Sequence, residues 1–152
     1  SVPVYISAEV DDPEQVFKYL EKWSQTRDLA ITSVTRIDVI VDHKELDYFG
    51  SYLRYYDAIV LTWRNDVRHW FDRWSRGHTT ERTFYHEVGH HFHQHSEGGQ
   101  VPDQEREAEQ YSKQMYRRAH SKFIFTARVL LFPILFFFLL RSYWKKWRNP
   151  LN

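Results

Sequence analysis

His86-Glu87-Val88-Gly89-His90 is the stretch of sequence that decides how the rest of the chain is interpreted. On an α-helix, residues four positions apart lie on one face, so His86 and His90 can present two imidazoles to one metal ion with Glu87 beside them. Zinc takes about four ligands, and a catalytic site takes three from the protein and leaves the fourth position for water. The stretch therefore predicts a helix that carries two zinc ligands and needs a third.

The third ligand must come from elsewhere in the chain. The three-histidine pattern of metzincins is absent, because Ser96 stands six residues after His90. A second helix is expected to follow, since Gly98-Gly99 ends the first and Pro102-Asp103 is typical of a helix start. A short connection makes two helices pack against each other, so Glu105, in the first turn of the second helix, could reach a metal held by the first.

H-E-x-x-H followed by E-x-x-A on the next helix resembles the gluzincin zinc metallopeptidases, above all the minigluzincins, the ImmA/IrrE-like proteins and the HtpX and CAAX-prenyl-protease group. The resemblance covers roughly residues 58 to 115. It implies an α+β, zincin-like domain with a small mixed sheet, an active-site helix and a ligand helix. It also implies Zn²⁺ bound by His86, His90 and Glu105, with Ala108 as the family's small residue.

The same resemblance implies a peptidase with Glu87 as general base, which takes a proton from the zinc-activated water and passes it to the leaving amine of a peptide or protein substrate. The family usually has Asp or Asn after the alanine as a partner of a ligand histidine, and Glu109 stands there instead. Two alternatives remain open. Glu87 could be a surface carboxylate beside a structural zinc, and the domain could be a non-catalytic accessory subunit of a membrane complex.

A short apolar run precedes the histidine helix and is expected to form a strand. By the resemblance, this strand lines the cleft and pairs with an extended substrate backbone, which requires that it lie at a sheet edge. An internal strand is the alternative. The residues of this predicted substrate strand are Ala58, Ile59, Val60, Leu61, Thr62 and Trp63.

Composition limits the remaining possibilities. A chain of 152 residues supports one ordinary domain with an appendage, and we expect a domain over residues 1–118 and an appendage over residues 119–152. Lys plus Arg number 21 and Asp plus Glu 20, so charge gives no reason to expect a nucleic-acid partner. The absence of cysteine excludes a thiolate zinc site, a disulfide and a cysteine nucleophile.

Hydrophobic spacing and turn signals predict the other elements. Val16, Phe17, Leu20 and Trp23 are expected to form the buried face of the first helix, which Asp12 caps. A short helix whose aromatic residues lie in the core is expected to end at Gly77. Thr79 or Thr80 is then expected to cap the histidine helix. The predicted elements are a strand over 2–8, a helix over 13–24, a strand over 31–41, a helix from about 45 to 56, a short helix over 67–74 and the histidine helix to about residue 95.

The end of the chain has a different character. Phe123–Leu140 is apolar apart from Thr126 and Arg128, and Arg141–Arg148 combines Trp, Tyr and basic residues. We expect a single-pass membrane anchor, with the amino-terminal domain in the cytoplasm because the sequence shows no signal peptide. There are two alternatives. The helix could be buried against a partner subunit of a larger membrane complex, or it could fold back over the cleft.

Three further histidines lie at the end of the histidine helix. His91 and His95 are four residues apart and could hold a second metal, but helical geometry directs them away from the first site. We expect His91, His93 and His95 to form a solvated or interfacial cluster.

Overall fold

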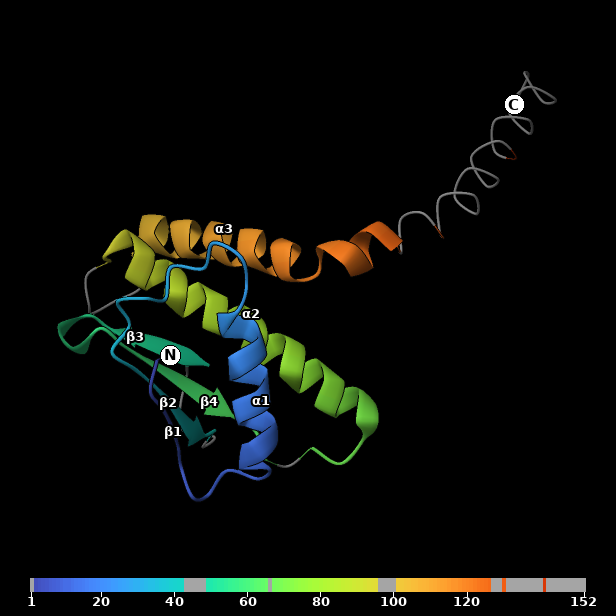
Figure 1. Ribbon diagram of the computed structural model, residues 1–152, viewed down its shortest axis with the longest axis horizontal. Helices are drawn as coiled ribbons and strands as arrows, with labels where there is room; N and C mark the ends of the chain where they lie inside the picture. The colour runs from blue at the N-terminus through green and yellow to red at the C-terminus, as the bar shows by residue number, and fades with distance from the viewer. Residues whose placement is uncertain are drawn as a thin grey trace. The chain divides into compact units, whose positions relative to one another are not determined.

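The structure, a computed structural model, describes residues 2–42, 49–65, 67–95, 101–126, 130 and 141. The chain divides into two compact units, Ser1–Ala119 and His120–Asn152, one residue beyond the expected boundary. The elements of the first unit (Figure 1) are β1 Val4–Ile6, α1 Pro13–Ser24, β2 Arg36–Val41, β3 Gly50–Leu53, the 3₁₀ turn η1 Arg54–Tyr56, β4 Ala58–Trp63, α2 Trp70–His93 and α3 Pro102–Ala119.

The four strands form one mixed sheet in the order β1-β2-β4-β3. Strands β1, β2 and β4 are parallel, and β3 runs antiparallel to β4. The prediction of an α+β fold with a small mixed sheet is confirmed. The strand over Ala58–Trp63 is also confirmed, but its expected place at an edge is wrong, because β4 pairs with β2 on one side and with β3 on the other.

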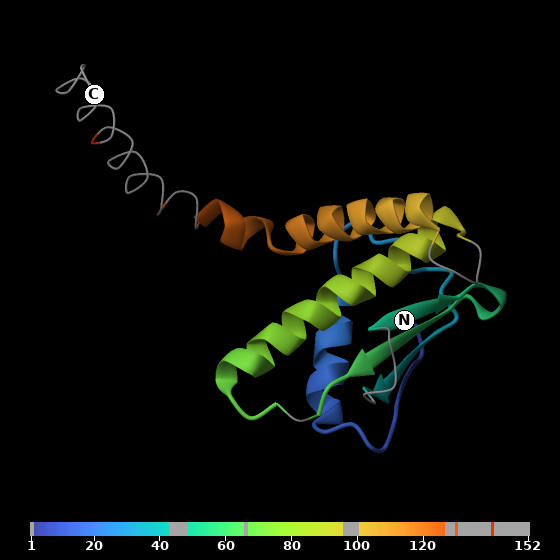
Figure 2. The same ribbon diagram turned by 180° about the vertical axis from the view of Figure 1, so that it is seen from behind.

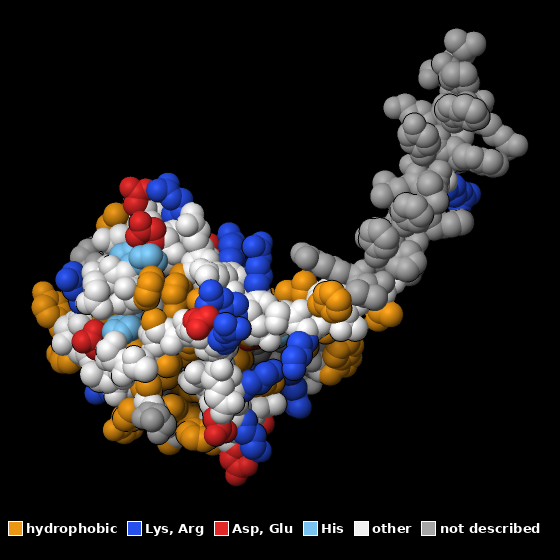
Figure 3. Space-filling view, turned by 45° about the horizontal axis from the view of Figure 1, so that its top comes forward, with side chains coloured by type: hydrophobic (Ala, Val, Ile, Leu, Met, Phe, Trp, Pro, Cys, Tyr) orange, Lys and Arg blue, Asp and Glu red, His pale blue; other side chains and the backbone are white. Residues whose placement is uncertain are grey.

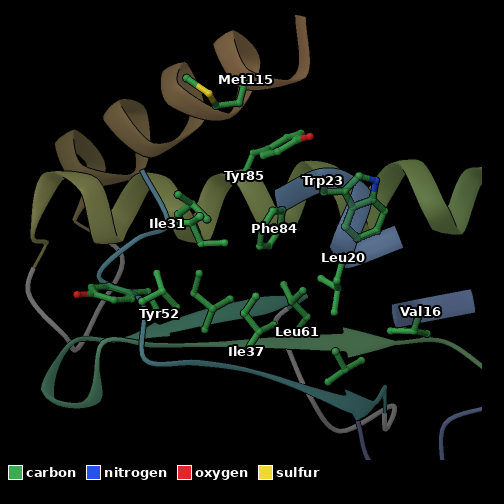
Figure 4. Close-up of a cluster of buried hydrophobic side chains, with 14 of the residues drawn as sticks. Val16, Leu20, Trp23, Ile31, Ile37, Tyr52, Leu61, Phe84, Tyr85 and Met115 are labelled. Atoms are coloured by element: carbon green, nitrogen blue, oxygen red, sulfur yellow. The ribbon is translucent and has the colours of Figure 1, made fainter. Parts of the chain in front are cut away.

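Helix α2 lies between the sheet and α3. Both views show α1 and α2 packed over the sheet and α3 on the side of α2 that faces away from it (Figures 1 and 2). Phe84 points from α2 towards the sheet, whereas Tyr85 points towards α3 (Figure 4), and both side chains are fully buried. Because α2 is covered on two sides, tertiary packing stabilises this helix in addition to its local propensity.

Helix α1 begins as its sequence predicts. The side chain of Asp12 accepts a hydrogen bond from the backbone N–H of Gln15 at 3.2 Å, which confirms the predicted cap. The buried face consists of Val16, Leu20 and Trp23. Phe17 was expected on that face, but it is 51% exposed. The buried face of this helix is therefore narrower than its apolar spacing indicates.

The predicted helix over residues 45 to 56 is wrong where the structure describes it. Gly50–Leu53 is strand β3, and pairing with β4 determines its conformation although its apolar spacing is helical. A Cβ at Gly50 would lie 2.6 Å from Cγ2 of Thr83 on α2, so β3 approaches α2 more closely than a side chain there would allow. Residues 43–48, where the helix was expected to start, lie outside the described residues.

The predicted helix break at Gly77 is also wrong, because α2 is continuous from Trp70 to His93. Gly77 is buried against the ring of Tyr19 of α1, and this packing favours a helix that runs past the glycine. The Thr80 hydroxyl donates to the carbonyl of Arg76 four residues earlier and so makes a bond within the helix, not a cap. The expected core aromatics are instead exposed: Trp70 by 80%, Phe71 by 55% and Trp74 by 55%.

In the second unit, residues 121–126 are helical. Within the described part of the chain, no helix combines the length and the apolar character needed to cross a membrane. Most of the predicted anchor, residues 127–129 and 131–140, lies outside the described residues.

Candidate metal centre

Close packing of α2 against α3 creates the candidate site. A Cβ at Gly89 would lie 3.0 Å from Cα and 3.1 Å from the carbonyl oxygen of Ala108, which is itself fully buried. Two residues without bulky side chains therefore allow the two helix backbones to meet. Since Glu105 and Ala108 are three residues apart, they share a face of α3, and the first turn of α3 lies beside His86 and His90.

Three donor groups converge at this contact. Nε2 of His86 lies 3.1 Å from Nε2 of His90. The Glu105 carboxylate reaches both imidazoles, with Oε2 at 3.2 Å from Nε2 of His86 and Oε1 at 3.5 Å from Nε2 of His90. We call these three residues the inner site; one ligand atom from each lies within 4.8 Å of the others.

The spacing of these atoms suits a tetrahedral zinc ion. Two ligand atoms at the usual zinc–nitrogen distance and a tetrahedral angle are about 3.3 Å apart. The separation of the two Nε2 atoms, 3.1 Å, and that between Nε2 of His86 and Oε2 of Glu105, 3.2 Å, are both close to this value. Two imidazoles and one carboxylate are also a donor set that zinc uses in catalytic sites. The residues therefore fit the ion that their types imply.

His90 is held in the state that binds metals. Burial, then the proximity of His86, lowers the pKa of His90 to about 4, against an opposing effect of the Glu105 carboxylate. The imidazole is therefore neutral at physiological pH and keeps a lone pair. An uncharged imidazole is the form that a divalent cation needs as a ligand.

Glu87 lies beside the inner site beneath β3. It is 6% exposed and accepts a hydrogen bond from the backbone N–H of Tyr52. Burial, then the negative charge of Glu105, raises its pKa to about 8. A Cβ at Gly50 would lie 3.1 Å from Oε1 of Glu87, so the edge strand β3 passes directly over this carboxyl group. Glu87 is thus a buried group whose pKa is poised near neutral pH.

The expected outer partner of His86 is close but not hydrogen-bonded. Oε2 of Glu109 lies 3.9 Å from Nδ1 of His86. The other oxygen of Glu109 pairs with Arg82 at 2.9 Å and Lys113 at 3.2 Å. Glu109 is therefore oriented by two cations, and its carboxylate faces the imidazole across a gap wider than a hydrogen bond.

His90 has an outer partner that the sequence analysis missed. Its Nδ1 lies 2.8 Å from Nδ1 of His95, whose Nε2 lies 3.0 Å from Oε2 of Glu107. Gln94 produces this arrangement, because its left-handed conformation, with φ 55°, turns the chain at the end of α2 and folds His95 back onto the helix. Glutamine is not a usual residue at such a position, so no local pattern predicted this turn.

The prediction of a solvated cluster directed away from the first site is wrong for His95, which is 6% exposed and contacts His90. The prediction of a solvated position is also wrong for His91. Its side chain is 3% exposed, and its Nε2 lies 2.8 Å from the hydroxyl of Ser33. Its Nδ1 lies 3.1 Å from the hydroxyl of Tyr52. Burial lowers the pKa of His91 despite the opposing charge of Asp57. His91 is thus a neutral, hydrogen-bonded histidine that ties α2 to the strand side of the core.

Comparison of the chain with protein-family models, with curated proteins and with solved structures finds no match. Its function has to be inferred from the site itself. Some histidine side chains reach the molecular surface (Figure 3), and each inner-site residue is partly exposed, so the inner site is accessible to ions from solvent.

Proposed function

We propose that the chain is a gluzincin-type zinc peptidase that hydrolyses peptide bonds. One observation carries this proposal: His86, His90 and Glu105 bring three ligand atoms within 4.8 Å of one another, at separations that suit zinc. The position of Glu87 supports it further, because a buried carboxyl group with a pKa of about 8 is suited to exchange a proton with water. The match between donor set and neighbouring base favours catalysis over a structural role.

A zinc ion at the inner site would supply a polarised substrate carbonyl and a more acidic water. Glu87 accepts the proton of the attacking water as the water oxygen bonds to the carbonyl carbon. The carbon–nitrogen bond then breaks, and Glu87 returns the proton to the amine nitrogen. His95 orients the imidazole of His90 from behind through a 2.8 Å contact between their Nδ1 atoms. Glu109 makes no such bond to His86, because its nearest oxygen lies 3.9 Å from Nδ1 of that residue.

We assign substrate binding to β3 in place of the strand over Ala58–Trp63. Among the described strands, β3 lies at the sheet edge next to Glu87, whereas β4 is internal. An extended peptide can add to such an edge through main-chain hydrogen bonds. Because Gly50 has no Cβ, β3 lies directly against Glu87, so a peptide along β3 would have its backbone close to the base.

The test is a peptidase assay on an unbiased peptide mixture with zinc-loaded wild-type protein, Glu87→Gln and Glu21→Gln. Glu21 is an exposed carboxylate on α1 and serves as the matched control. Loss of the base is expected to reduce the rate about 10²- to 10⁴-fold while zinc stays bound. The control is expected to keep the wild-type rate. Equal cleavage by wild type and Glu87→Gln would contradict the proposed role of Glu87.

The competing function is a non-catalytic accessory subunit of a membrane complex. It is favoured by the exposed aromatic side chains of Trp70, Phe71 and Trp74 at the start of α2, since large exposed apolar groups often mark a protein interface. A wild-type protein that binds zinc but cleaves no peptide in the mixture would favour this function over the peptidase.

A further inference from the structure

A second group of potential ligands lies beside the inner site. His93, His95 and Glu107 each offer one ligand atom within 4.8 Å of the others, and we call them the outer group. Histidines two residues apart on a helix do not face each other. Here the left-handed Gln94 between them brings their rings into parallel stacking, with centroids 5.3 Å apart. The convergence of these ligands therefore depends on a specific backbone turn.

The outer group has the same donor types as the inner site and is more open. Oε2 of Glu107 lies 3.0 Å from Nε2 of His95 and 4.0 Å from Nδ1 of His93. The side chains of Glu107 and His93 are 51% and 33% exposed, whereas that of His95 is 6% exposed. Two imidazoles and a carboxylate suit a divalent transition-metal cation such as zinc.

We propose that the outer group is a second site for such a cation and that it fills only while the inner site is empty. The claim that zinc at the inner site excludes a cation from the outer site rests on the proposed function. The existence of the outer site does not rest on it. The physical link is the 2.8 Å contact between Nδ1 of His90 and Nδ1 of His95, which requires one proton between the two nitrogens.

A neutral imidazole has one N–H group and one lone pair. When His90 binds a cation through Nε2, its proton is at Nδ1 and is donated to Nδ1 of His95. The proton of His95 is then at Nε2, where it is donated to Glu107. His95 has no lone pair left for a second cation in this state.

The reverse state is equally self-consistent. A cation at Nε2 of His95 leaves the proton of His95 at Nδ1, which donates to Nδ1 of His90. The proton of His90 is then at Nε2, so His90 cannot serve the inner site. Filling both sites would place two N–H groups against each other across 2.8 Å.

The test is a calorimetric titration with Zn²⁺ alone, in excess, on four proteins. The first is wild type, and the second is an inner-site variant that carries His86→Ala and Glu105→Gln together. The third and fourth add His93→Ala or His69→Ala to this inner-site variant. His69 is an exposed histidine at the start of α2 and controls for the loss of a surface imidazole. Circular dichroism verifies that each variant is folded.

Wild type is expected to bind one zinc ion and no more. The inner-site variant is expected to bind one zinc ion at the outer group. Adding His93→Ala to this variant is expected to abolish the binding, whereas adding His69→Ala is expected to leave it unchanged. An inner-site variant that binds no zinc, or whose binding survives His93→Ala, would overturn the outer site. Two zinc ions on wild type would overturn the exclusion. A fifth protein, wild type with His93→Ala alone, separates the two proposals: loss of its zinc ion, beside an inner-site variant that binds one, would contradict the proposed function alone.

A second measurement needs no variant of the inner site. Long-range ¹H–¹⁵N correlation spectra of the zinc-loaded wild type report which ring nitrogen of His95 carries the proton. The proton is expected at Nε2, and a proton at Nδ1 would contradict the exclusion.

Discussion

Burial shifts the pKa values of Glu87 and His90 in opposite directions, although both residues lie on α2 only three positions apart. Burial raises the pKa of the Glu87 carboxyl group from 4.5 to about 8, while burial lowers the pKa of the His90 imidazole from 6.5 to about 4. In both cases the uncharged form is favoured, as expected where water is excluded. A metal ion reverses this preference for the carboxyl group, because a nearby positive charge stabilises the carboxylate.

This difference predicts how the stability of the metal-free protein depends on pH. A raised pKa means that native Glu87 holds its proton between pH 4.5 and about 8 while the unfolded chain has lost it, so its contribution to stability is lost as pH rises through that range. His90 acts in the opposite direction, but only between pH 6.5 and about 4. Glu87 therefore dominates this pair above pH 6.5.

We expect the free energy of unfolding of chelator-treated wild type, and with it the melting temperature, to fall between pH 6.5 and 8, with a contribution from this group on the order of 1 kcal/mol per pH unit. Glu87→Gln is expected to lack that part of the fall, and Glu21→Gln to keep it. Parallel pH profiles for wild type and Glu87→Gln would show that Glu87 is ionised in the native, metal-free protein.

Glu107 is predicted to influence the inner site without touching it. Its carboxylate lies 3.0 Å from His95, which in turn contacts His90, so Glu107→Ala removes the end of this chain of hydrogen bonds. We expect zinc affinity at the inner site to fall about tenfold to a hundredfold, the usual effect of removing an outer partner. Asp103 is an exposed residue one turn earlier on α3, and Asp103→Ala is expected to change the zinc affinity little. Equal zinc affinities for the two variants would exclude the role of Glu107.

At the scale of elements, the contact between α2 and α3 decides whether the site exists. The two glycines of α2 provide a matched pair. A Cβ at Gly89 meets the backbone of Ala108 at 3.0 Å, which cannot move independently of α3, whereas a Cβ at Gly77 meets the ring of Tyr19 at an ordinary 3.6 Å. Both positions are helical, so the same substitution gains similar helix propensity at each.

We expect Gly89→Ala to destabilise the protein by about 1–3 kcal/mol, the usual cost of overpacking, and to weaken zinc binding because α3 is pushed away. Gly77→Ala is expected to be neutral or stabilising by up to about 1 kcal/mol. Chemical denaturation and zinc titration measure both effects. A Gly89→Ala variant as stable as Gly77→Ala would mean that the helices are not in close contact at Ala108.

The local sequence predicted some elements well and others poorly, for identifiable physical reasons. The cap of α1 by Asp12 and the strand over Ala58–Trp63 depend on residues close together in the chain, and both were predicted correctly. The continuity of α2 through Gly77 depends on Tyr19, which is distant in sequence. Strand β3 depends on pairing with β4, which starts five residues after Leu53, but the helical spacing of its apolar residues concealed this hairpin. Spacing alone could not reveal these contacts.

The same distinction holds at the site. A four-residue spacing was enough to place His86 and His90 on one face, and a short connection was enough to suggest that Glu105 comes near them. The approach of His95 depends on the left-handed conformation of Gln94, which no local pattern signals. The pairing of this histidine with Glu107 was therefore missed.

At the scale of the whole molecule, the two compact units predict that the site survives without the second unit. We expect a chain that ends at Ala119 to keep the fold and the zinc affinity of the full chain, because α2, α3 and the sheet all lie within Ser1–Ala119. We also propose that the apolar tail attaches the protein to membranes. The full chain is then expected to sediment with lipid vesicles, and the shortened chain to stay in solution. Equal sedimentation of both chains would contradict attachment through the tail.

The central claim is that His86, His90 and Glu105 hold one zinc ion, and elemental analysis of protein purified without chelators tests it most directly. The analysis includes wild type and His93→Ala. The inner-site substitutions are made on the His93→Ala background, so that the outer group cannot bind zinc in those proteins. We predict about one zinc per chain in both forms, loss of zinc in His90→Ala and Glu105→Gln on the His93→Ala background, and retention in Glu87→Gln. A chain without zinc, or zinc that survives the loss of His90 and Glu105 on that background, would contradict the account.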